Sequence, residues 1–278
     1  MLGQRVITAV VLLALLLPAL FAASTWPFIG LTLLLIAAAG WEWGRLNGAS
    51  SVLALAMGAV VAAAGAAAVA AGWTALVPSP AWWAAAAFWI AGGAYALTSG
   101  PAAWPQLPPA ARRGLGLAML WAAWLAIAQA RSLGIDFILS VFCLVWVADI
   151  AAYFGGRKFG RRKLAPSISP GKSWEGVWSG MAGVLLLALA WIAFDRAFAP
   201  AGASLYTRLY SHLGAAGALV ALLLLAAMSV VGDLVESLVK RAAGAKDSSG
   251  LLPGHGGVLD RVDALLPVFP IALALASL

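Results

Sequence analysis

The sequence predicts an all-α integral membrane protein, a polytopic helical bundle of about nine transmembrane helices. Of the 278 residues, 64% are hydrophobic and only 10% are charged, and the mean hydropathy is +0.98. A soluble domain carries about 25% charged residues, so this chain has too few charges to cover a surface in water. Its single cysteine, Cys143, excludes an intramolecular disulfide bond and leaves the redox compartment open.

Apolar segments recur along the whole chain, each close to the roughly 20 residues that a membrane-spanning helix needs. The expected spans are Val6–Ala23, Trp26–Trp43, Ser51–Ala71, Pro80–Leu97, Gly114–Ala130, Gly134–Tyr153, Trp174–Phe194, Leu213–Leu234 and Val262–Leu278. Pro80–Leu97 is the weakest of these candidates. The first segment could instead be a signal peptide, because Arg5 precedes it. Its length exceeds the roughly 7–15 apolar residues of a signal peptide and another span follows at once, which favours a membrane helix.

The basic residues test this topology independently. If the spans alternate, 14 of the 17 Lys and Arg residues fall on the side of the N-terminus, and the other three are Arg131, Arg196 and Arg208. Cytoplasmic loops carry the Lys and Arg excess. We therefore expect a multi-pass protein of the inner (cytoplasmic) membrane with a cytoplasmic N-terminus and a C-terminus on the opposite side. The net charge of +7 has the same origin, so we expect no nucleic acid as a partner.

The acidic residues divide the chain into two regions. Glu42 is the one acidic residue before Asp136, and nine of the ten lie from Asp136 onward. We therefore expect an N-terminal transmembrane scaffold at residues 1–133 and a C-terminal catalytic transmembrane region at residues 134–278, with cytoplasmic polar loops. Within the scaffold, the Ala- and Gly-rich run Ala54–Gly72 indicates close helix packing.

The first polar segment, Asp149–Glu175, begins inside an apolar span, where a carboxylate is expensive. Six basic residues follow between Arg157 and Lys172, with glycines and prolines among them. A positive-inside loop explains this charge, but it explains neither Asp149 nor the neighbouring serines. Gly and Ser beside Lys and Arg suit the binding of phosphate oxygens.

Within this segment, Gly171-Lys172-Ser173 resembles the end of a Walker A loop. That pattern needs a glycine five residues before Gly171, where this chain has Pro166, and it needs a preceding β-strand, which we do not expect here. We therefore reject the Walker A interpretation.

The second polar segment is Gly232–Asp263. Asp233, Glu236 or Ser237, and Lys240 recur at a spacing that places them on one helix face. A turn rich in Gly and Pro follows, and then Asp260 and Asp263 open the last helix. A solvated helix end is the plain alternative, but carboxylates with a phosphate-bearing ligand are the usual way to hold Mg²⁺. The pattern favours metal–phosphate chemistry, in which His255 fits a loop-ordering role as readily as a catalytic one.

A transporter is the alternative from another class of protein, because charges within a membrane also mark ion pathways. Transporter sites tend to lie at the bilayer midplane between repeated halves. Here the charges lie in loops at one membrane face, and no repeat of fixed period is visible, so we favour an enzyme.

The stretch from Ser237 to Asp263 resembles the signature of the phosphatidate cytidylyltransferases, also called CDP-diacylglycerol synthases. It reads Ser237-Leu-Val-Lys-Arg, then Lys246-Asp247, then Pro253-Gly-His-Gly-Gly-Val-Leu-Asp-Arg-Val-Asp263, at the family's spacing. Asp149–Glu175 also resembles the family's other polar segment, except that Gly171 stands where a second Lys is expected. The first half of the chain is similar to the family only in being hydrophobic.

The resemblance implies that phosphatidate and CTP react, with Mg²⁺, to give CDP-diacylglycerol and pyrophosphate at the surface of the lipid bilayer. It implies Asp233 and Asp260 as metal ligands. The candidate catalytic residues are Asp233, Lys246, Asp247, His255, Asp260, Arg261 and Asp263. The candidate substrate-binding residues are Asp149, Tyr153, Arg157, Lys158, Ser169, Lys172, Ser173, Glu175, Ser237, Lys240 and Arg241.

Two relatives within the enzymes remain as alternatives: a cytidylyltransferase for another phospholipid, and a CTP-dependent polyprenol kinase. The sequence also leaves open whether the chain acts as a monomer or as a homodimer.

Overall fold

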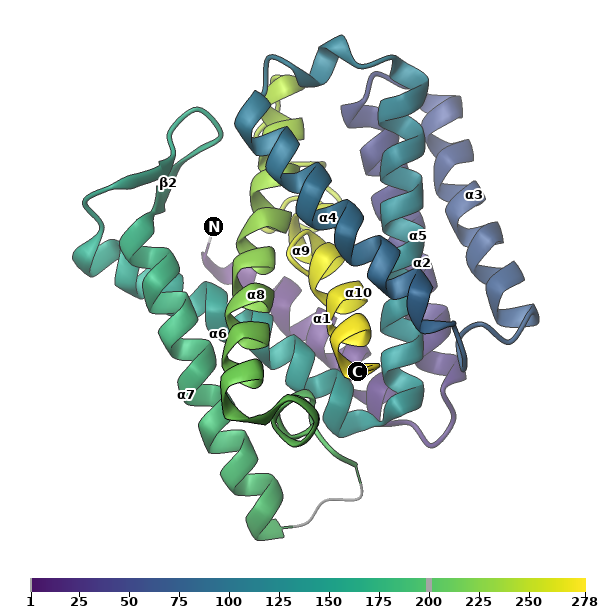
Figure 1. Ribbon diagram of the computed structural model, residues 1–278. Helices are drawn as coiled ribbons and strands as arrows, with labels where there is room; N and C mark the ends of the chain where they lie inside the picture. Colours follow the sequence, from purple (N-terminus) through teal and green to yellow (C-terminus); the bar gives the residue numbers. More distant parts are fainter. Residues whose placement is uncertain (1, 199–201) are drawn as a thin grey trace.

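The computed structural model describes residues 2–198 and 202–278, which form a bundle of helices with one small hairpin of strands (Figure 1). In chain order the elements are α1 (Leu2–Phe21), α2 (Trp26–Leu46), α3 (Ser51–Ala70), α4 (Ser79–Ser99), the 3-10 helix η1 (Trp104–Gln106), α5 (Pro109–Leu133), α6 (Ile135–Phe159), β1 (Lys163–Ala165), β2 (Ser169–Ser173), α7 (Trp174–Phe198), α8 (Leu205–Ala242), α9 (Leu259–Val262) and α10 (Leu265–Ala276).

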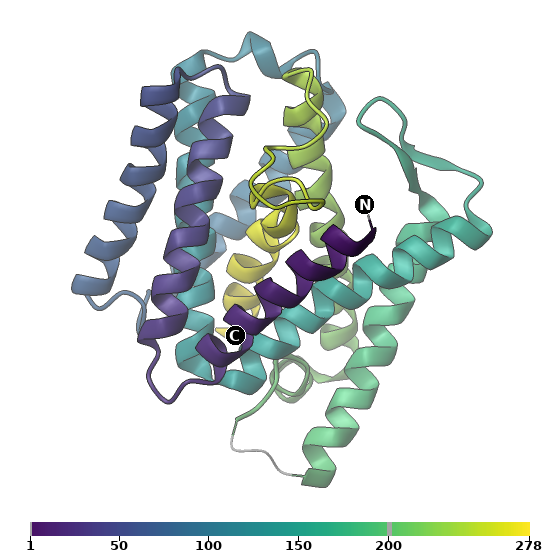
Figure 2. The same ribbon diagram turned by 180° about the vertical axis from the view of Figure 1, so that it is seen from behind.

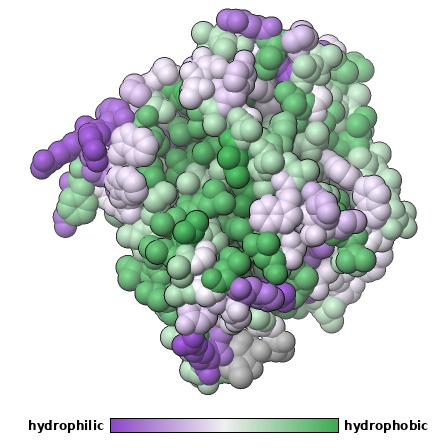
Figure 3. Space-filling model, viewed as in Figure 1, coloured by the Kyte–Doolittle hydropathy of each residue, from purple (hydrophilic) through white to green (hydrophobic). Residues whose placement is uncertain are grey.

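Within the described residues, six helices are long and apolar enough to cross a membrane, namely α2, α3, α5, α6, α7 and α8. The apolar stretch of α1, Val6–Phe21, is shorter, and α10 has only 12 residues. Hydrophobic side chains cover the middle of the molecular face in Figure 3, and hydrophilic ones gather at the hairpin and at the two ends. These features fit the expected all-α, polytopic class, whereas the number of nine spans stays a prediction.

Glycine residues set the closest contacts between helices. A Cβ atom at Gly58 of α3 would lie 2.6 Å from the carbonyl oxygen of Ala37 in α2. A Cβ atom at Gly180 of α7 would lie 2.8 Å from the carbonyl oxygen of Ala148 in α6. Small residues allow helix backbones to approach this closely in a membrane. The expected packing role of Ala54–Gly72 is therefore confirmed at Gly58.

Helix α10 runs through the middle of the bundle, where it contacts α4, α5, α6 and α8 (Figure 1). Helix α1 crosses the opposite side of the molecule obliquely (Figure 2). Every residue of α10 from Leu265 to Leu275 is buried. A helix surrounded on all sides needs no polar face, which explains its uninterrupted apolar sequence.

Helix α8 bends at Gly214, whose φ of 67° and ψ of −177° are not helical. A positive φ is accessible to glycine at little cost, so the glycine permits a short first part of the helix to meet a long second part. The expected span Leu213–Leu234 begins at this bend. The helix continues beyond Leu234 to Ala242 and carries the polar residues of the second segment to the end of the bundle.

The loop between α6 and α7 contains an antiparallel pair of strands, in which Lys163 lies opposite Ser173 and Ala165 opposite Ser169. The expectation that no strand precedes Lys172 is therefore wrong, because Lys172 lies within β2. The strand runs directly into α7 without a phosphate loop between them, so the Walker A interpretation still fails. Prolines at 166 and 170 exclude a helix here, and the hairpin satisfies backbone groups that a free loop would leave unpaired.

The basic residues expected on the side opposite the N-terminus have structural partners. Arg131 is buried and donates to the carbonyl oxygens of Leu20 and Ala22, at the turn after α1. The guanidinium of Arg196 lies over the ring of Tyr210, and that of Arg208 lies over the ring of Phe137. Packing therefore accounts for these exceptions to the charge asymmetry.

Candidate functional site

The two polar segments meet at the side of α8. Lys172 of β2 donates a hydrogen bond of 2.6 Å to Oδ2 of Asp233, and the Ser237 hydroxyl donates one of 3.2 Å to Oδ1. One turn further along, Lys240 donates a hydrogen bond of 2.6 Å to Oδ1 of Asp260. The predicted common face of Asp233, Ser237 and Lys240 is thus confirmed, and it is this face that binds the hairpin and the loop before α9.

Close backbone packing brings the beginning of α10 against Asp233. A Cβ atom at Gly232 would overlap the carbonyl oxygen of Asp263, so only glycine permits this approach. The carboxylates of Asp233, Asp263 and Asp149 lie near enough to interact electrostatically with one another and with Lys172. Asp149 is exposed, and Asp233 is partly exposed, so this acidic cluster is accessible from outside the bundle.

Asp260 is held by four hydrogen bonds. Its Oδ1 accepts from Lys240, and its Oδ2 accepts from the backbone N–H and hydroxyl of Ser248 and from the backbone N–H of Gly257. Burial by itself raises the pKa of Asp260, which lies outside the membrane-spanning helices, but these hydrogen bonds lower it to about 2. The carboxylate is therefore ionised at neutral pH, and it fixes the loop between α8 and α9.

Lys240 also lies 2.5 Å from Oε2 of Glu236, one turn earlier in α8. This contact is an ion pair by distance, but its angles do not make a hydrogen bond, and within the described residues both Glu236 oxygens are buried without another partner. Lys240 therefore neutralises two buried carboxylates, which is what makes their burial tolerable.

Several residues predicted to bind substrate form hydrogen bonds in and around the hairpin. Glu175 accepts hydrogen bonds from the backbone N–H groups of Arg161 and Arg162 and from the Arg162 side chain. The Ser173 hydroxyl accepts from the backbone N–H of Gly176. Arg241 donates to the carbonyl oxygens of Ile168 and Ala245, which joins the hairpin to the end of α8. These groups shape the site, and none of these interactions requires a ligand.

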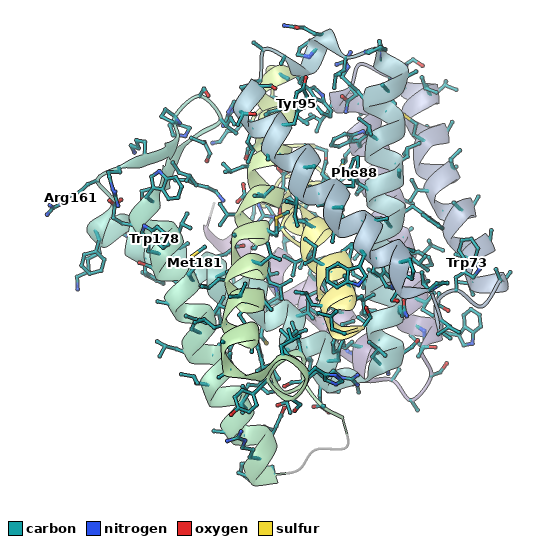
Figure 4. The ribbon with its side chains drawn as sticks, viewed as in Figure 1. Trp73, Phe88, Tyr95, Arg161, Trp178 and Met181 are labelled. Atoms are coloured by element: carbon teal, nitrogen blue, oxygen red, sulfur yellow. The ribbon has the colours of Figure 1, made fainter. Side chains whose placement is uncertain are left out.

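Other predicted residues of the first segment remain exposed around the site. They are Asp149, Tyr153, Arg157 and Lys158 of α6, while Ser169 in β2 is partly buried. The guanidinium of Arg157 lies 3.5 Å from the Tyr153 hydroxyl, to which it donates. Arg161 extends outward from the molecule beside the hairpin (Figure 4). Arg157, Lys158 and Arg161 are thus exposed cations at this end of α6.

The loop between α8 and α9 carries the remaining predicted residues. Lys246, Asp247 and Arg261 are exposed, and His255 is partly buried with no hydrogen-bond partner for Nδ1 among the described residues. A polar cavity of about 370 Å³ lies between this loop and α2. Its lining includes Trp41, Arg45, Asp247, Ser248 and Ser249.

An apolar groove of about 220 Å³ lies between α4, η1, α5 and α8. Phe88 and Tyr95 of α4 contribute to it (Figure 4), and α8 contributes Val235 and Leu238, on the helix face away from Asp233. No charged side chain among the described residues lines the groove. The groove therefore lies on the opposite side of α8 from the polar residues Asp233 and Ser237.

One residue with a central place in this site, Glu42, was not among the residues predicted to be functional. This residue of α2 is fully buried and accepts hydrogen bonds from the backbone N–H groups of Val258 and Leu259 and from the hydroxyls of Ser248 and Ser249. The signal was present in the sequence, because a lone carboxylate within an apolar helix is as expensive as Asp149.

Comparison with known proteins gives a family. The sequence model described as the cytidylyltransferase family matches residues 3–278. A phosphatidate cytidylyltransferase of Pseudomonas aeruginosa is 40% identical over 281 aligned residues, which cover 99% of this chain and 97% of the relative. A protein of the same name from Haemophilus influenzae is 48% identical over 137 residues, or 49% of this chain and 44% of the relative. One from Brucella suis is 47% identical over 133 residues, or 48% of this chain and 44% of the relative.

Proposed function

This chain belongs to the cytidylyltransferase family, and we propose that it transfers the cytidylyl group of CTP to phosphatidate, giving CDP-diacylglycerol and pyrophosphate. The observation that carries the proposal is that one face of α8 contacts both polar segments, through Asp233 with Lys172 and through Lys240 with Asp260. Both polar segments that resemble the family contribute to this convergence.

The chain's own residues suit a reaction between two anions. A phosphate monoester has a second pKa of about 6, so the phosphate of phosphatidate is already nucleophilic at neutral pH and needs no general base. The task of the protein is to bring this oxygen to the α-phosphorus of CTP and to offset the repulsion between the phosphates. Lys172 and the exposed Arg261 lie within electrostatic range of Asp149 and supply positive charge to the acidic cluster. Arg157 and Lys158 add exposed cations at the end of α6, the helix that carries Asp149.

We propose Mg²⁺ as the cofactor, held by Asp233 and Asp260. Bound there, it would neutralise charge on the phosphate oxygens of CTP. Asp233 fits this role well, because it is partly exposed and lies within electrostatic range of Asp149 and Asp263. Asp260 fits it less directly, since Oδ1 accepts from Lys240 and Oδ2 from Ser248 and Gly257, so that it would have to give up one of these contacts to hold the ion. Among the described residues, no three His, Cys, Asp or Glu side chains form a ready metal site, so part of the ligand set would come from the substrate, as Mg²⁺ commonly requires.

Placement in the membrane follows from the same chemistry. The acyl chains of phosphatidate stay in the bilayer, whereas a soluble enzyme would expose them at about 0.8 kcal/mol per CH₂ group. We propose that the protein spans the inner membrane and that the site lies at its cytoplasmic face, because most Lys and Arg residues belong to the end of the bundle that carries the site. Arg113 donates to the carbonyl oxygen of Gly48, and Arg241 to that of Ile168, so the basic residues of several loops meet at this end.

The test is the fate of the CTP phosphates. Purified protein in lipid micelles is given phosphatidate and CTP labelled either at the α- or at the γ-phosphate. A cytidylyltransferase places the α label in lipid and releases the γ label in pyrophosphate. A CTP-dependent lipid kinase places the γ label in lipid, and a transporter leaves both labels in CTP, so either outcome would refute the proposal.

A further inference from the structure

Glu42 is a buried charge in the half of the chain that otherwise serves as scaffold. It lies in the apolar helix α2 with 0% of its surface exposed. Within the described residues no basic side chain forms an ion pair with it. Burying a carboxylate without a cation destabilises the fold unless hydrogen bonds compensate for the lost hydration. The hydrogen bonds of Glu42 therefore show which groups make its burial possible.

Those contacts come from the two ends of one loop. Ser248 and Ser249, in the part of the loop that leaves α8, donate their hydroxyls at 3.1 and 2.5 Å. Val258 and Leu259, in the part that enters α9, donate their backbone N–H groups at 2.9 and 2.7 Å. Glu42 therefore connects the two ends of the loop to each other and to α2, although more than 200 residues of sequence separate it from them.

The same loop holds Asp260. The Ser248 hydroxyl lies between the two carboxylates, at 3.1 Å from Oε2 of Glu42 and 2.8 Å from Oδ2 of Asp260. Gly257 also lies between them, because its N–H donates to Asp260 and a Cβ atom on it would overlap the Glu42 carboxylate. Moving Glu42 must therefore move two of the groups that orient Asp260.

We propose that Glu42 is a positioning residue for the transfer reaction, acting through Ser248 and Gly257 to fix the orientation of Asp260. The proposal rests on the proposed function, since it assumes that Asp260 serves nucleotidyl transfer. A carboxylate is required because both of its oxygens accept from backbone N–H groups that cannot reorient, while the Ser249 hydroxyl donates to it as well and Ser248 shares its single hydroxyl proton between Glu42 and Asp260. A glutamine would turn its own N–H₂ group toward one of the donors.

The primary test is Glu42→Gln, with Asp195→Asn as the matched control. Asp195 is also a buried carboxylate that accepts from hydroxyls, those of Ser204 and Thr207, but it lies in α7 away from the site. We expect Glu42→Gln to lower kcat by about 10–100-fold, the range found for residues that orient ligating groups, with the KM for phosphatidate unchanged within about twofold. Asp195→Asn should lower the melting temperature while kcat stays at the wild-type value.

Ser248→Ala supplies a second readout that a general loss of stability would not produce. Since Glu42 and Ser248 act on the same carboxylate, the double variant should lose much less than the product of the two single losses in kcat. If Glu42→Gln does not fold, Ser249→Ala takes its place, because it removes one donor to Glu42 and none to Asp260. A several-fold loss of kcat is then expected.

The outcomes separate the two proposals. If Asp260→Asn keeps wild-type activity, the proposed role of Asp260 fails. If Asp260→Asn is inactive but Glu42→Gln and Ser249→Ala keep wild-type kcat, or if the losses of Glu42→Gln and Ser248→Ala multiply, the positioning role of Glu42 is refuted and the proposed function stands.

Discussion

Two lysines, Lys172 and Lys240, form ion pairs with carboxylates at α8 at the same distance but in different surroundings, which predicts very different contributions to stability. Lys172 lies 2.6 Å from Asp233, with 26% and 30% of their side chains exposed. Lys240 lies 2.6 Å from Asp260, with 11% and 4% exposed, and it also faces Glu236, which is 2% exposed. Burial, and not distance, should therefore decide which lysine stabilises the fold.

The magnitudes follow from what each substitution leaves behind. Lys240→Met leaves Glu236 and Asp260 buried without a cation, and breaking such a pair costs about 3–5 kcal/mol in the free energy of unfolding. Lys172→Met leaves Asp233 in contact with water, so the cost should be about 0–1 kcal/mol. A protein stable by about 5–15 kcal/mol would lose a large share of its stability in the first variant only.

Unfolding by SDS in mixed detergent micelles, followed through the fluorescence of the 14 tryptophans, measures both changes. The double variant Glu236→Gln, Lys240→Met serves as an internal control, because it removes one of the two orphaned carboxylates and should recover part of the loss. The reasoning fails if Lys240→Met and Lys172→Met have equal unfolding free energies, or if the double variant is less stable than Lys240→Met alone.

Three further predictions concern catalysis, packing and topology. Lys172→Met should raise the KM for CTP more than that for phosphatidate, because it removes a point charge from the nucleotide phosphates; unchanged constants would leave Lys172 as a topology determinant only. Gly232→Ala should abolish activity, because its methyl group would overlap the Asp263 carbonyl, whereas Gly30→Ala, with no neighbour within 4 Å, should be active in the same assay. A reporter fused after Leu278 should be active outside the cytoplasm, and activity only within it would contradict the orientation argued from the basic residues.

Local spacing predicted part of the site. The face shared by Asp233, Ser237 and Lys240 follows from helix geometry alone, and the structure shows the hydrogen bonds that use it. The same spacing could not supply the partner of Asp233, because Lys172 is 61 residues away in the sequence.

The fold departs from the sequence-based prediction where tertiary contacts override local pattern. Within the apolar span expected at Val262–Leu278 the structure has the 12-residue helix α10, and Val262 instead ends the separate short helix α9. The strands at Lys163–Ala165 and Ser169–Ser173 lie in a stretch read as loop, where Pro and Ser obscure the short strand pattern. Glu42 was read as scaffold because its partners are supplied by a loop more than 200 residues later.

The most direct test of the central claim is the rate of CDP-diacylglycerol formation as Mg²⁺ concentration is varied, for wild type, Asp233→Asn, Asp260→Asn and Asp263→Asn. Each substitution keeps the size of the side chain and removes its charge. We expect Asp233→Asn and Asp260→Asn to insert and fold but to lose several orders of magnitude in turnover, because metal-based charge stabilisation contributes several kcal/mol. Asp263→Asn should lose less. Near-normal turnover and Mg²⁺ dependence in Asp233→Asn or Asp260→Asn would contradict the claim.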